Sequence, residues 1–262
     1  YQKWGSPDNP GIILVHGSGA HSHWWDFVAP LLIDKYQVSA LDLSGMGTSD
    51  HRKKYSPEVF GNEIIAVAKD SGFFDDRSSN PIICGHSLGG YMSIHAANLA
   101  LETIKGVIMI DSPIRPPDFD YSNHQGSGPI RKRKTYPDKE TILERFKLAP
   151  DQPTDFPFII DYIAKKSIQE ANGGYEWKFD DTLFSKLGYP HMPKNHAFNL
   201  MCPLGFIYGE KSALVTKPIL NYMKSKFKED TPIIEIEGAY HHVLLDKPIE
   251  LAETIKEIGR DW

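Results

Sequence analysis

Ser87 is the residue of this chain whose surroundings most clearly indicate chemistry. It stands between Gly85 and Gly89 in the pattern Gly-x-Ser-x-Gly. The apolar residues 82–84 before it predict a buried strand, and residues 91–97 after it predict the beginning of a helix. A tight turn between the two presents the serine hydroxyl at the end of a sheet, and a Cβ atom on either side would crowd that turn. We therefore predict that Ser87 is a nucleophile.

The backbone of two predicted turns can hold the negative charge that attack by a serine creates. A serine hydroxyl attacks well only when a base takes its proton and hydrogen-bond donors hold the oxyanion. A glycine-rich turn follows the predicted strand Gly11–Val15 and exposes backbone N–H groups. We assign the oxyanion hole to the N–H groups of Ser18 and Leu88, and we keep Gly19 as a candidate for contact with the substrate.

A base for this serine is expected near the carboxyl end of the chain. His241 and His242 stand side by side just after a predicted strand at residues 233–236. Imidazole is the most frequent general base in enzymes, because its charge changes near neutral pH. Both histidines are therefore candidates.

Motifs spread along the whole chain resemble those of the α/β-hydrolase superfamily. They are an oxyanion turn at residues 16–17, an Asp-x-x-Gly-x-Gly-x-Ser loop at 42–49, the serine turn at 85–90 and a histidine motif at 238–248. The resemblance implies an α/β fold with a doubly wound, mostly parallel sheet and an inserted helical cap. It also implies a serine hydrolase, without identifying the substrate, because this fold hosts many chemistries.

The resemblance favours His241 as the base. In the family pattern an acidic residue stands five positions after the catalytic histidine and a proline seven positions after it. Asp246 and Pro248 fit that pattern for His241. His242 is then expected to line the site or to pack under a loop. The elbow residue His86 receives no role in proton transfer, and both histidines are candidates for contact with the substrate.

The acid that would orient the histidine departs from the commonest family pattern. That acid usually stands three residues after the glycine that ends a late strand, and here the position is Ser212, after Gly209. A serine cannot hold an imidazolium as a buried carboxylate does. Some relatives place the acid one strand earlier in the sheet, where this chain has Asp111. We predict Asp111 as the acid, with Glu210 as the alternative.

Charge and composition limit the possible partners. The 262 residues suffice for one large α/β domain with an insertion. The 29 basic and 34 acidic residues give a formal net charge of −5, which does not favour nucleic acid or an anionic membrane as a partner. No apolar run reaches the ~18 residues of a spanning helix. The sequence does not predict an oligomeric state.

Cys84 and Cys202 are the two cysteines, and both fall at predicted strands or their edges. We expect buried free thiols rather than a disulfide framework. The chain begins at Tyr1, and the resemblance implies that one or two strands precede it, with residues 1–4 as the end of one. We expect a cytoplasmic protein, and a cleaved leader is the alternative.

The alternating pattern of strands and helices is interrupted in the middle of the chain. We divide the sequence into a core at residues 1–113 and 199–262 and a cap at residues 114–198. Within the cap we predict helices at residues 138–148 and 158–172, loops and no strands. Trp177 is the cap aromatic that we select as a candidate for substrate binding. The basic run at residues 131–134 is expected to be a solvated surface.

These observations predict a serine hydrolase that needs no cofactor and no metal. The expected activity is that of a carboxylesterase acting on small or medium acyl esters through an acyl-enzyme. A carbon–carbon hydrolase of ring-cleavage products uses the same three residues and is the first alternative. A ligand receptor on the same fold with little or no turnover is the second.

Overall fold

The computed structural model describes residues 1–75, 80–101, 103–120, 132–187 and 200–262. Its main element is a sheet with the strand order β1-β3-β2-β4-β5-β8-β9. Neighbouring strands are parallel except for β1 with β3, so the predicted mostly parallel α/β sheet is confirmed. The strands are β1 (Gln2–Trp4), β2 (Gly11–Val15), β3 (Gln37–Leu41), β4 (Ile82–His86), β5 (Gly106–Ile110), β8 (Leu204–Gly209) and β9 (Ile233–Ile236).

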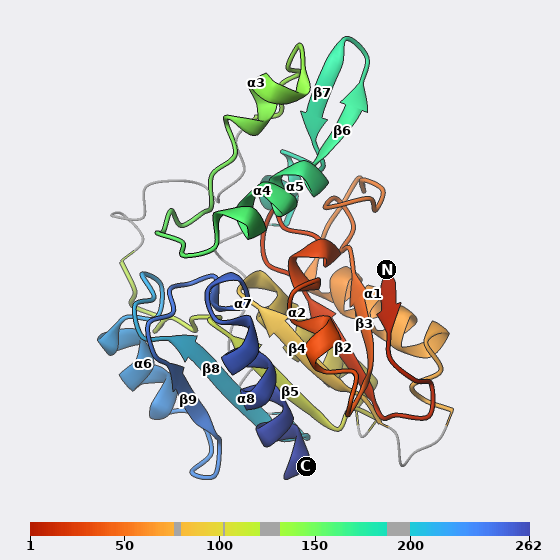
Figure 1. Ribbon diagram of the computed structural model, residues 1–262. Helices are drawn as coiled ribbons and strands as arrows, with labels where there is room; N and C mark the ends of the chain where they lie inside the picture. Colours follow the sequence, from red (N-terminus) through yellow and green to blue (C-terminus); the bar gives the residue numbers. More distant parts are fainter. Residues whose placement is uncertain (76–79, 102, 121–131, 188–199) are drawn as a thin grey trace.

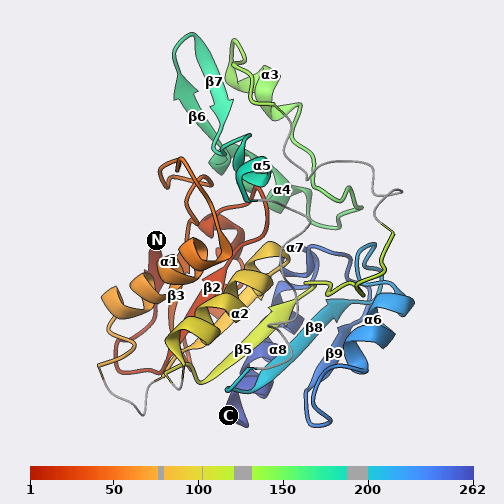
Figure 2. The same cartoon turned by 180° about the vertical axis from the view of Figure 1, so that it is seen from behind.

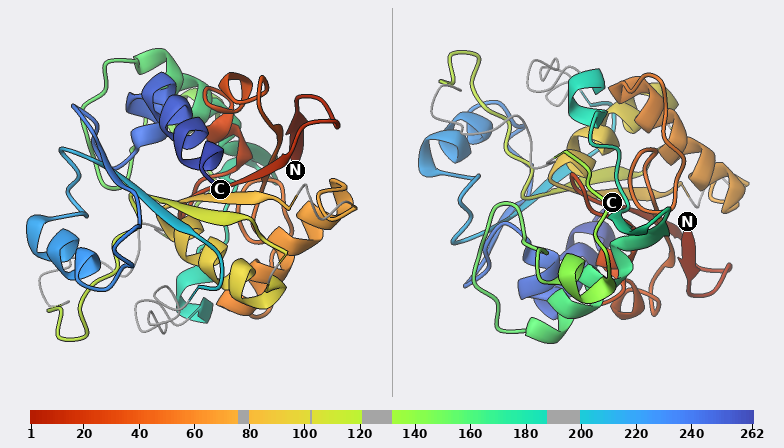
Figure 3. Two further views of the ribbon diagram at one scale, coloured as in Figure 1. Left: turned by 90° about the horizontal axis from the view of Figure 1, so that it is seen from below. Right: turned by 90° about the horizontal axis from the view of Figure 1, so that it is seen from above.

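Helices cover both faces of this sheet. Helix α8 lies in front of the sheet in Figure 1, whereas α1 and α2 lie in front when the molecule is seen from behind in Figure 2. Seen from below and from above in Figure 3, the core has three layers, with the sheet between two layers of helices. The helices of the core are α1 (Pro57–Asp70), α2 (Leu88–Ala100), α6 (Lys217–Lys224), α7 (Val243–Asp246) and α8 (Pro248–Arg260), with short 3₁₀ helices η1 (Ser22–Trp25) and η2 (Ala29–Leu31).

Alternate residues of each central strand enter opposite apolar cores. In β2, Ile13 and Val15 pack on the side of α1 and α2, while Ile12 and Leu14 pack on the side of α8. All four side chains are fully buried. Strands that are covered on both faces are expected to be apolar at consecutive positions, which is why the sequence shows unbroken hydrophobic runs.

The parallel strands end at one edge of the sheet, and polar residues follow several of them there. His16 follows β2, Ser87 follows β4, Asp111 follows β5 and Glu210 follows β8. In an open parallel sheet this edge is where ligands bind. The topology therefore brings together groups that are up to 194 residues apart in the sequence, from His16 to Glu210.

The cap segment, residues 132–187, lies over this edge (Figure 1). It contains α3 (Lys139–Leu143), α4 (Pro157–Lys166), β6 (Ile168–Ala171), β7 (Gly174–Trp177) and α5 (Leu183–Leu187). Backbone hydrogen bonds join it to the loop after β3, from Gly47 N to Lys178 O (2.9 Å) and from Asp180 N to Gly45 O (2.7 Å). The predicted boundaries of the cap at residues 114 and 198 stay a prediction, because residues 121–131 and 188–199 lie outside the described residues.

Three predictions for the cap segment were wrong. The helix predicted at residues 138–148 ends at Leu143, and the helix predicted at 158–172 ends at Lys166. The prediction of no strands fails as well, since β6 and β7 form an antiparallel hairpin. Ser167 closes α4 because its hydroxyl donates to the Ile163 carbonyl and so competes with the helical backbone.

The hairpin had a signal in the sequence. Ala171 pairs with Gly174, which leaves Asn172 and Gly173 as a two-residue loop. Asn-Gly is a favoured sequence of such loops, because glycine takes a positive φ without strain. Gly173 has a φ of +89°. The apolar pattern of the preceding helix concealed this turn.

Both cysteines are free, with Cys84 buried and Cys202 half-buried. Residues 2–4 form the predicted strand. Within the described ranges, no helix combines the length and the apolar character that crossing a membrane requires. The basic run lies partly outside those ranges, because Arg131 is not described.

Candidate active site

Ser87 occupies a strained turn between β4 and α2. Its backbone angles are φ 53° and ψ −117°, in a region that residues other than glycine rarely adopt. Its N–H donates to the Ile110 carbonyl (2.9 Å), and its carbonyl accepts from the Ser112 hydroxyl (2.8 Å). Strain of this kind persists where surrounding contacts hold it, and it is frequent at functional sites. Ser87 itself is half-buried, although the residues on either side of it are buried.

Glycines let the backbone of this turn approach its neighbours closely. A Cβ atom on Gly85 would lie 2.3 Å from the carbonyl carbon of Gly89. One on Gly89 would lie 2.3 Å from the carbonyl oxygen of Val15. Side chains at these positions would push α2 away from the sheet edge, which is the physical reason for the Gly-x-Ser-x-Gly pattern.

The turn after β2 lies directly beside Ser87. A Cβ atom on Gly17 would come within 3.2 Å of the Ser87 Cβ atom. Leu88 is the first residue of α2, where backbone N–H groups have no partner within the helix. The N–H of Gly19 is directed elsewhere, to the Met46 sulfur at 3.3 Å. The oxyanion role of Ser18 and Leu88 stays a prediction, and this geometry supports it better than a contribution from the Gly19 N–H.

His241 and Asp111 form a buried pair at the same sheet edge. The Nδ1–H of His241 donates to the Asp111 carboxylate at 2.6 Å. His241 is 2% exposed and Asp111 is fully buried. The hydrogen bond fixes the proton on Nδ1 and so leaves the Nε2 lone pair to accept a proton. Within the described residues no hydrogen bond joins the His241 ring to the Ser87 hydroxyl; such contacts often form only when substrate is bound.

Three hydrogen bonds hold the Asp111 carboxylate beside the position of the usual acid of the family. Asp111 has a positive φ of 45° directly after β5. Its Oδ1 also accepts from the Ser212 hydroxyl (2.7 Å), and its Oδ2 accepts from the Gly209 N–H (3.0 Å). Ser212 therefore stands at the position of the usual acid and donates to the acid on the neighbouring strand. Sequence reasoning identified Ser212 as a departure but missed this contact.

Glu210, the alternative acid, is directed away from His241. Its carboxylate accepts from the Gly238 N–H at 2.8 Å, and the residue is exposed. The contact stabilises the turn after β9. The geometry therefore brings Asp111, rather than Glu210, to His241.

His86 and His242 surround the ring of His241. The ring centroid of His241 lies 4.8 Å from each of theirs. His86 Nε2–H donates to the His241 carbonyl at 2.9 Å. Burial, followed by the proximity of His241, holds the pKa of both imidazoles well below the usual 6.5. Both rings are therefore neutral near pH 7, and they pack under the site.

A glutamine of the cap segment holds the loop that carries His241. Gln152 Nε2 donates to both carboxylate oxygens of Asp246 (2.9 Å each). Its Oε1 accepts from the His242 N–H (3.0 Å), while Asp246 also accepts from the Tyr240 N–H (2.8 Å). Burial raises the pKa of Asp246, and these hydrogen bonds oppose that effect. Sequence reasoning named Asp246 as part of the histidine motif but missed Gln152.

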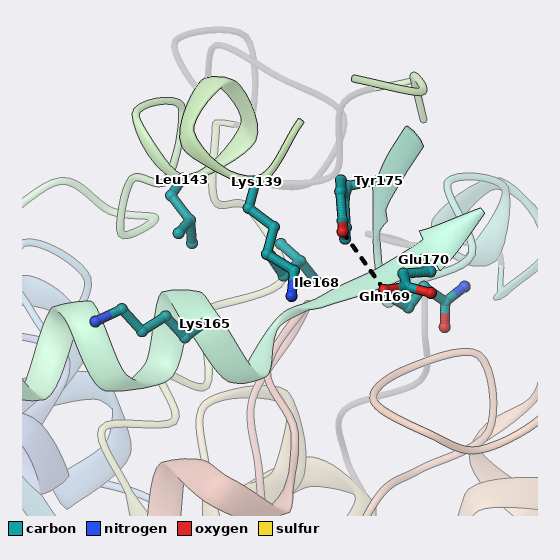
Figure 4. Close-up of a pocket in the computed structure, with 7 residues that line it drawn as sticks. All are labelled: Lys139, Leu143, Lys165, Ile168, Gln169, Glu170 and Tyr175. Atoms are coloured by element: carbon teal, nitrogen blue, oxygen red, sulfur yellow. Dashed lines mark hydrogen bonds between the residues drawn. The ribbon is translucent and has the colours of Figure 1, made fainter. Parts of the chain in front are cut away.

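Trp177 is the remaining candidate of the sequence analysis. Trp177 ends β7 and packs against Phe146 within the cap segment, with ring centroids 5.9 Å apart. Its described contacts do not extend to Ser87 or His241. A cavity of about 420 Å³ lies beside the hairpin, and no candidate site residue borders it (Figure 4). Its lining consists of Lys139, Leu143, Lys165, Ile168, Gln169, Glu170 and Tyr175.

A parallel sheet with a serine turn and a histidine–carboxylate pair at one edge is the arrangement of the α/β hydrolases. A model of the Alpha/beta hydrolase family matches residues 12–254. The chain therefore belongs to the alpha/beta hydrolase family, and it is a hydrolase.

Named relatives and solved structures agree with this assignment. The chain is 25% identical to a (Lyso)-N-acylphosphatidylethanolamine lipase of Mus musculus, over 96% of this chain and 79% of the lipase. It is 22% identical to the Esterase Rv0045c of Mycobacterium tuberculosis, over 98% of this chain and 84% of the esterase. Its fold resembles that of the thioesterase domain from the curacin biosynthetic pathway, with a TM-score of 0.78, 24% identity, and coverage of 97% and 93% of the two chains.

Proposed function

We propose that this protein is a carboxylesterase that cleaves small or medium acyl esters through an acyl-enzyme. The observation that carries the proposal is the 2.6 Å hydrogen bond from His241 to Asp111, beside the strained Ser87. A relative named as an esterase and another named as a lipase support an ester as the substrate. Besides the ester and water, the proposed reaction uses only the side chains and backbone of this site.

In the first half of the reaction the Ser87 hydroxyl attacks the carbonyl carbon of the ester. His241 Nε2 takes the hydroxyl proton, and Asp111 stabilises the imidazolium that forms. The N–H groups of Ser18 and Leu88 donate to the oxyanion of the tetrahedral intermediate. His241 then gives the proton to the leaving alkoxide, and the bond between carbonyl carbon and alcohol oxygen breaks.

In the second half water replaces the serine. His241 takes a proton from water, and the resulting hydroxide attacks the acyl-enzyme carbonyl. The tetrahedral intermediate collapses, the carboxylic acid leaves, and the proton returns to Ser87. The cap segment lies over this edge of the sheet, and we propose that it selects the acyl chain.

The test is a panel of p-nitrophenyl esters with acyl chains of two to twelve carbons, together with one dienoate of the ring-cleavage type. We expect ester turnover well above the enzyme-free rate for the native chain and baseline turnover for Ser87→Ala. Ser185→Ala is the matched control, because Ser185 is exposed in the cap segment. Preferential cleavage of the dienoate would assign carbon–carbon hydrolysis instead, and turnover of neither substrate would favour a receptor.

A further inference from the structure

His86, His241 and His242 form a compact cluster of imidazoles that the reaction uses only in part. Their exposed fractions are 2%, 2% and 3%. The centroids of His86 and His242 are 5.6 Å apart, and His241 is 4.8 Å from each. One ring nitrogen from each residue lies within 4.8 Å of one from each of the others. Burial of three imidazoles side by side is costly unless their nitrogens have partners.

The hydrogen bonds of the cluster leave three nitrogen lone pairs. His241 holds its proton on Nδ1, against Asp111, so its Nε2 is unprotonated. His86 holds its proton on Nε2, against the His241 carbonyl, so its Nδ1 is unprotonated. His86 Nδ1 and both nitrogens of His242 are buried without a hydrogen-bond partner among the described residues. A buried polar atom without a partner requires an explanation, and an ion is one.

We propose that His86, His241 and His242 bind one divalent transition-metal ion, such as Zn²⁺, which inhibits the enzyme. Imidazole nitrogen is a preferred ligand of Zn²⁺, Cu²⁺ and Ni²⁺, whereas Mg²⁺ and Ca²⁺ prefer oxygen. The ion would be an inhibitor and not a cofactor. It binds the Nε2 lone pair of His241, and that lone pair then cannot take the proton of Ser87.

Two features of the site favour such an ion. Asp111 hydrogen-bonds the far nitrogen of His241, which is the arrangement of a carboxylate, a histidine and zinc in many metal sites. Zn–N bonds of about 2.0–2.1 Å place tetrahedral ligands about 3.3 Å apart. One nitrogen of each ring lies within 4.8 Å of one nitrogen on each of the other rings, so the rings must approach by up to about 1.5 Å to reach that spacing.

Binding is tested directly with Zn²⁺ and a chromophoric chelator as competitor, on the native chain stripped of metal. We expect one Zn²⁺ bound per chain in the micromolar range or tighter. His242→Phe keeps an aromatic ring and removes both nitrogens, and we expect it to weaken binding at least tenfold. His86→Asn is a second variant with the same expectation. His51→Asn is the matched control, because the His51 side chain is 40% exposed and lies outside the cluster.

Equal Zn²⁺ affinity in the native chain and in both cluster variants would overturn the proposal, provided that circular dichroism shows all of them folded. So would a loss of affinity in His51→Asn of the same size. Asp111→Asn should weaken Zn²⁺ binding by about 10- to 100-fold, as expected for an outer-shell partner.

The inhibition rests on the proposed esterase function, whereas the binding does not. Zn²⁺ should therefore lower ester turnover over the concentration range in which it binds, EDTA should restore turnover, and Mg²⁺ should have no effect. Activation by Zn²⁺ would contradict the inhibitory role. One bound Zn²⁺ in a chain that cleaves no ester would reject the proposed function and leave the metal site standing.

Discussion

The substitution Asp111→Asn tests how the carboxylate controls His241, because it keeps the size of the side chain and replaces one oxygen by an amide nitrogen. In the native site Oδ1 accepts from His241 Nδ1 (2.6 Å) and from the Ser212 hydroxyl (2.7 Å). The other oxygen accepts from the Gly209 N–H at 3.0 Å. The nitrogen of the new amide can stand at the place of Oδ1 or at the place of Oδ2.

The two orientations of this amide leave different groups without a hydrogen-bond partner. With the amide nitrogen at the place of Oδ2, two donors would face each other, the amide and the Gly209 N–H. With the nitrogen at the place of Oδ1, the amide donates to His241 Nδ1, and its oxygen still accepts from the Gly209 N–H. The Ser212 proton then loses its acceptor, and the Ser212 oxygen already accepts from the N–H groups of Leu214 and Val215. In this orientation His241 carries its proton on Nε2 and cannot accept one from Ser87.

The wrong tautomer of His241 should lower kcat strongly and change the free energy of unfolding little. Loss of the acid by this route lowers kcat by about 10⁴ in a Ser-His-Asp enzyme. That factor corresponds to about 5.4 kcal/mol in the activation barrier. The assay is kcat on p-nitrophenyl butyrate, with thermal unfolding as the check on folding. Glu210→Gln should cost less than tenfold, since Glu210 is exposed and contacts Gly238.

The double variant Asp111→Asn with Ser212→Asp sharpens this test. It returns a carboxylate to the usual position of the family, where the Ser212 hydroxyl oxygen lies 2.7 Å from Asp111 Oδ1. We expect at least tenfold more activity than in Asp111→Asn alone. Near-native kcat in Asp111→Asn, or an equal loss in Glu210→Gln, would refute the reasoning.

Three further predictions concern Gln152, the buried histidines and Trp177. Gln152→Ala should lower kcat about tenfold with little change in KM, because Gln152 holds the loop that carries His241. The control Gln169→Ala, at an exposed residue, should change neither kcat nor KM. A change confined to KM would contradict this role of Gln152. Burial lowers the pKa of His86 and His242, so both imidazoles are neutral in the folded protein. Below about pH 6.5 the unfolded chain binds more protons at these residues than the folded protein does. Each histidine should therefore lower the free energy of unfolding by about 1.4 kcal/mol per pH unit as the pH falls. Urea midpoints between pH 7.5 and 5.5 measure this, and an unchanged slope in His242→Phe would contradict it. Trp177→Ala should shift the acyl-length preference in the ester panel, and a uniform loss across the panel would make the residue a packing element instead.

The sheet was predictable because its signals are local. Unbroken apolar runs fixed the central strands, and Gly-x-Ser-x-Gly fixed the turn at Ser87, since only small residues permit the close approach of Gly89 to Val15. The choice between Asp111 and Glu210 followed from the order of strands that the family resemblance implied. The structure then brought the Asp111 carboxylate within 2.6 Å of His241.

The contacts between distant segments were not predictable from the sequence. Gln152 meets Asp246 across 94 residues of chain, and Ser212 meets Asp111 across 101. Polar side chains of this kind carry no periodicity, so their partners are set only by the packing of the cap and the loops. The hairpin at Asn172 was missed for a different reason: the helical pattern before it was allowed to outweigh an Asn-Gly turn.

The most direct test of the central claim is covalent labelling of the nucleophile with a fluorophosphonate, followed by mass spectrometry of the labelled peptide. The proposed mechanism predicts one label per chain, on Ser87, with concurrent loss of ester turnover. It also predicts no label in Ser87→Ala and much slower labelling in Asp111→Asn. A label on another residue of the native chain, or labelling that persists in Ser87→Ala, would contradict the mechanism.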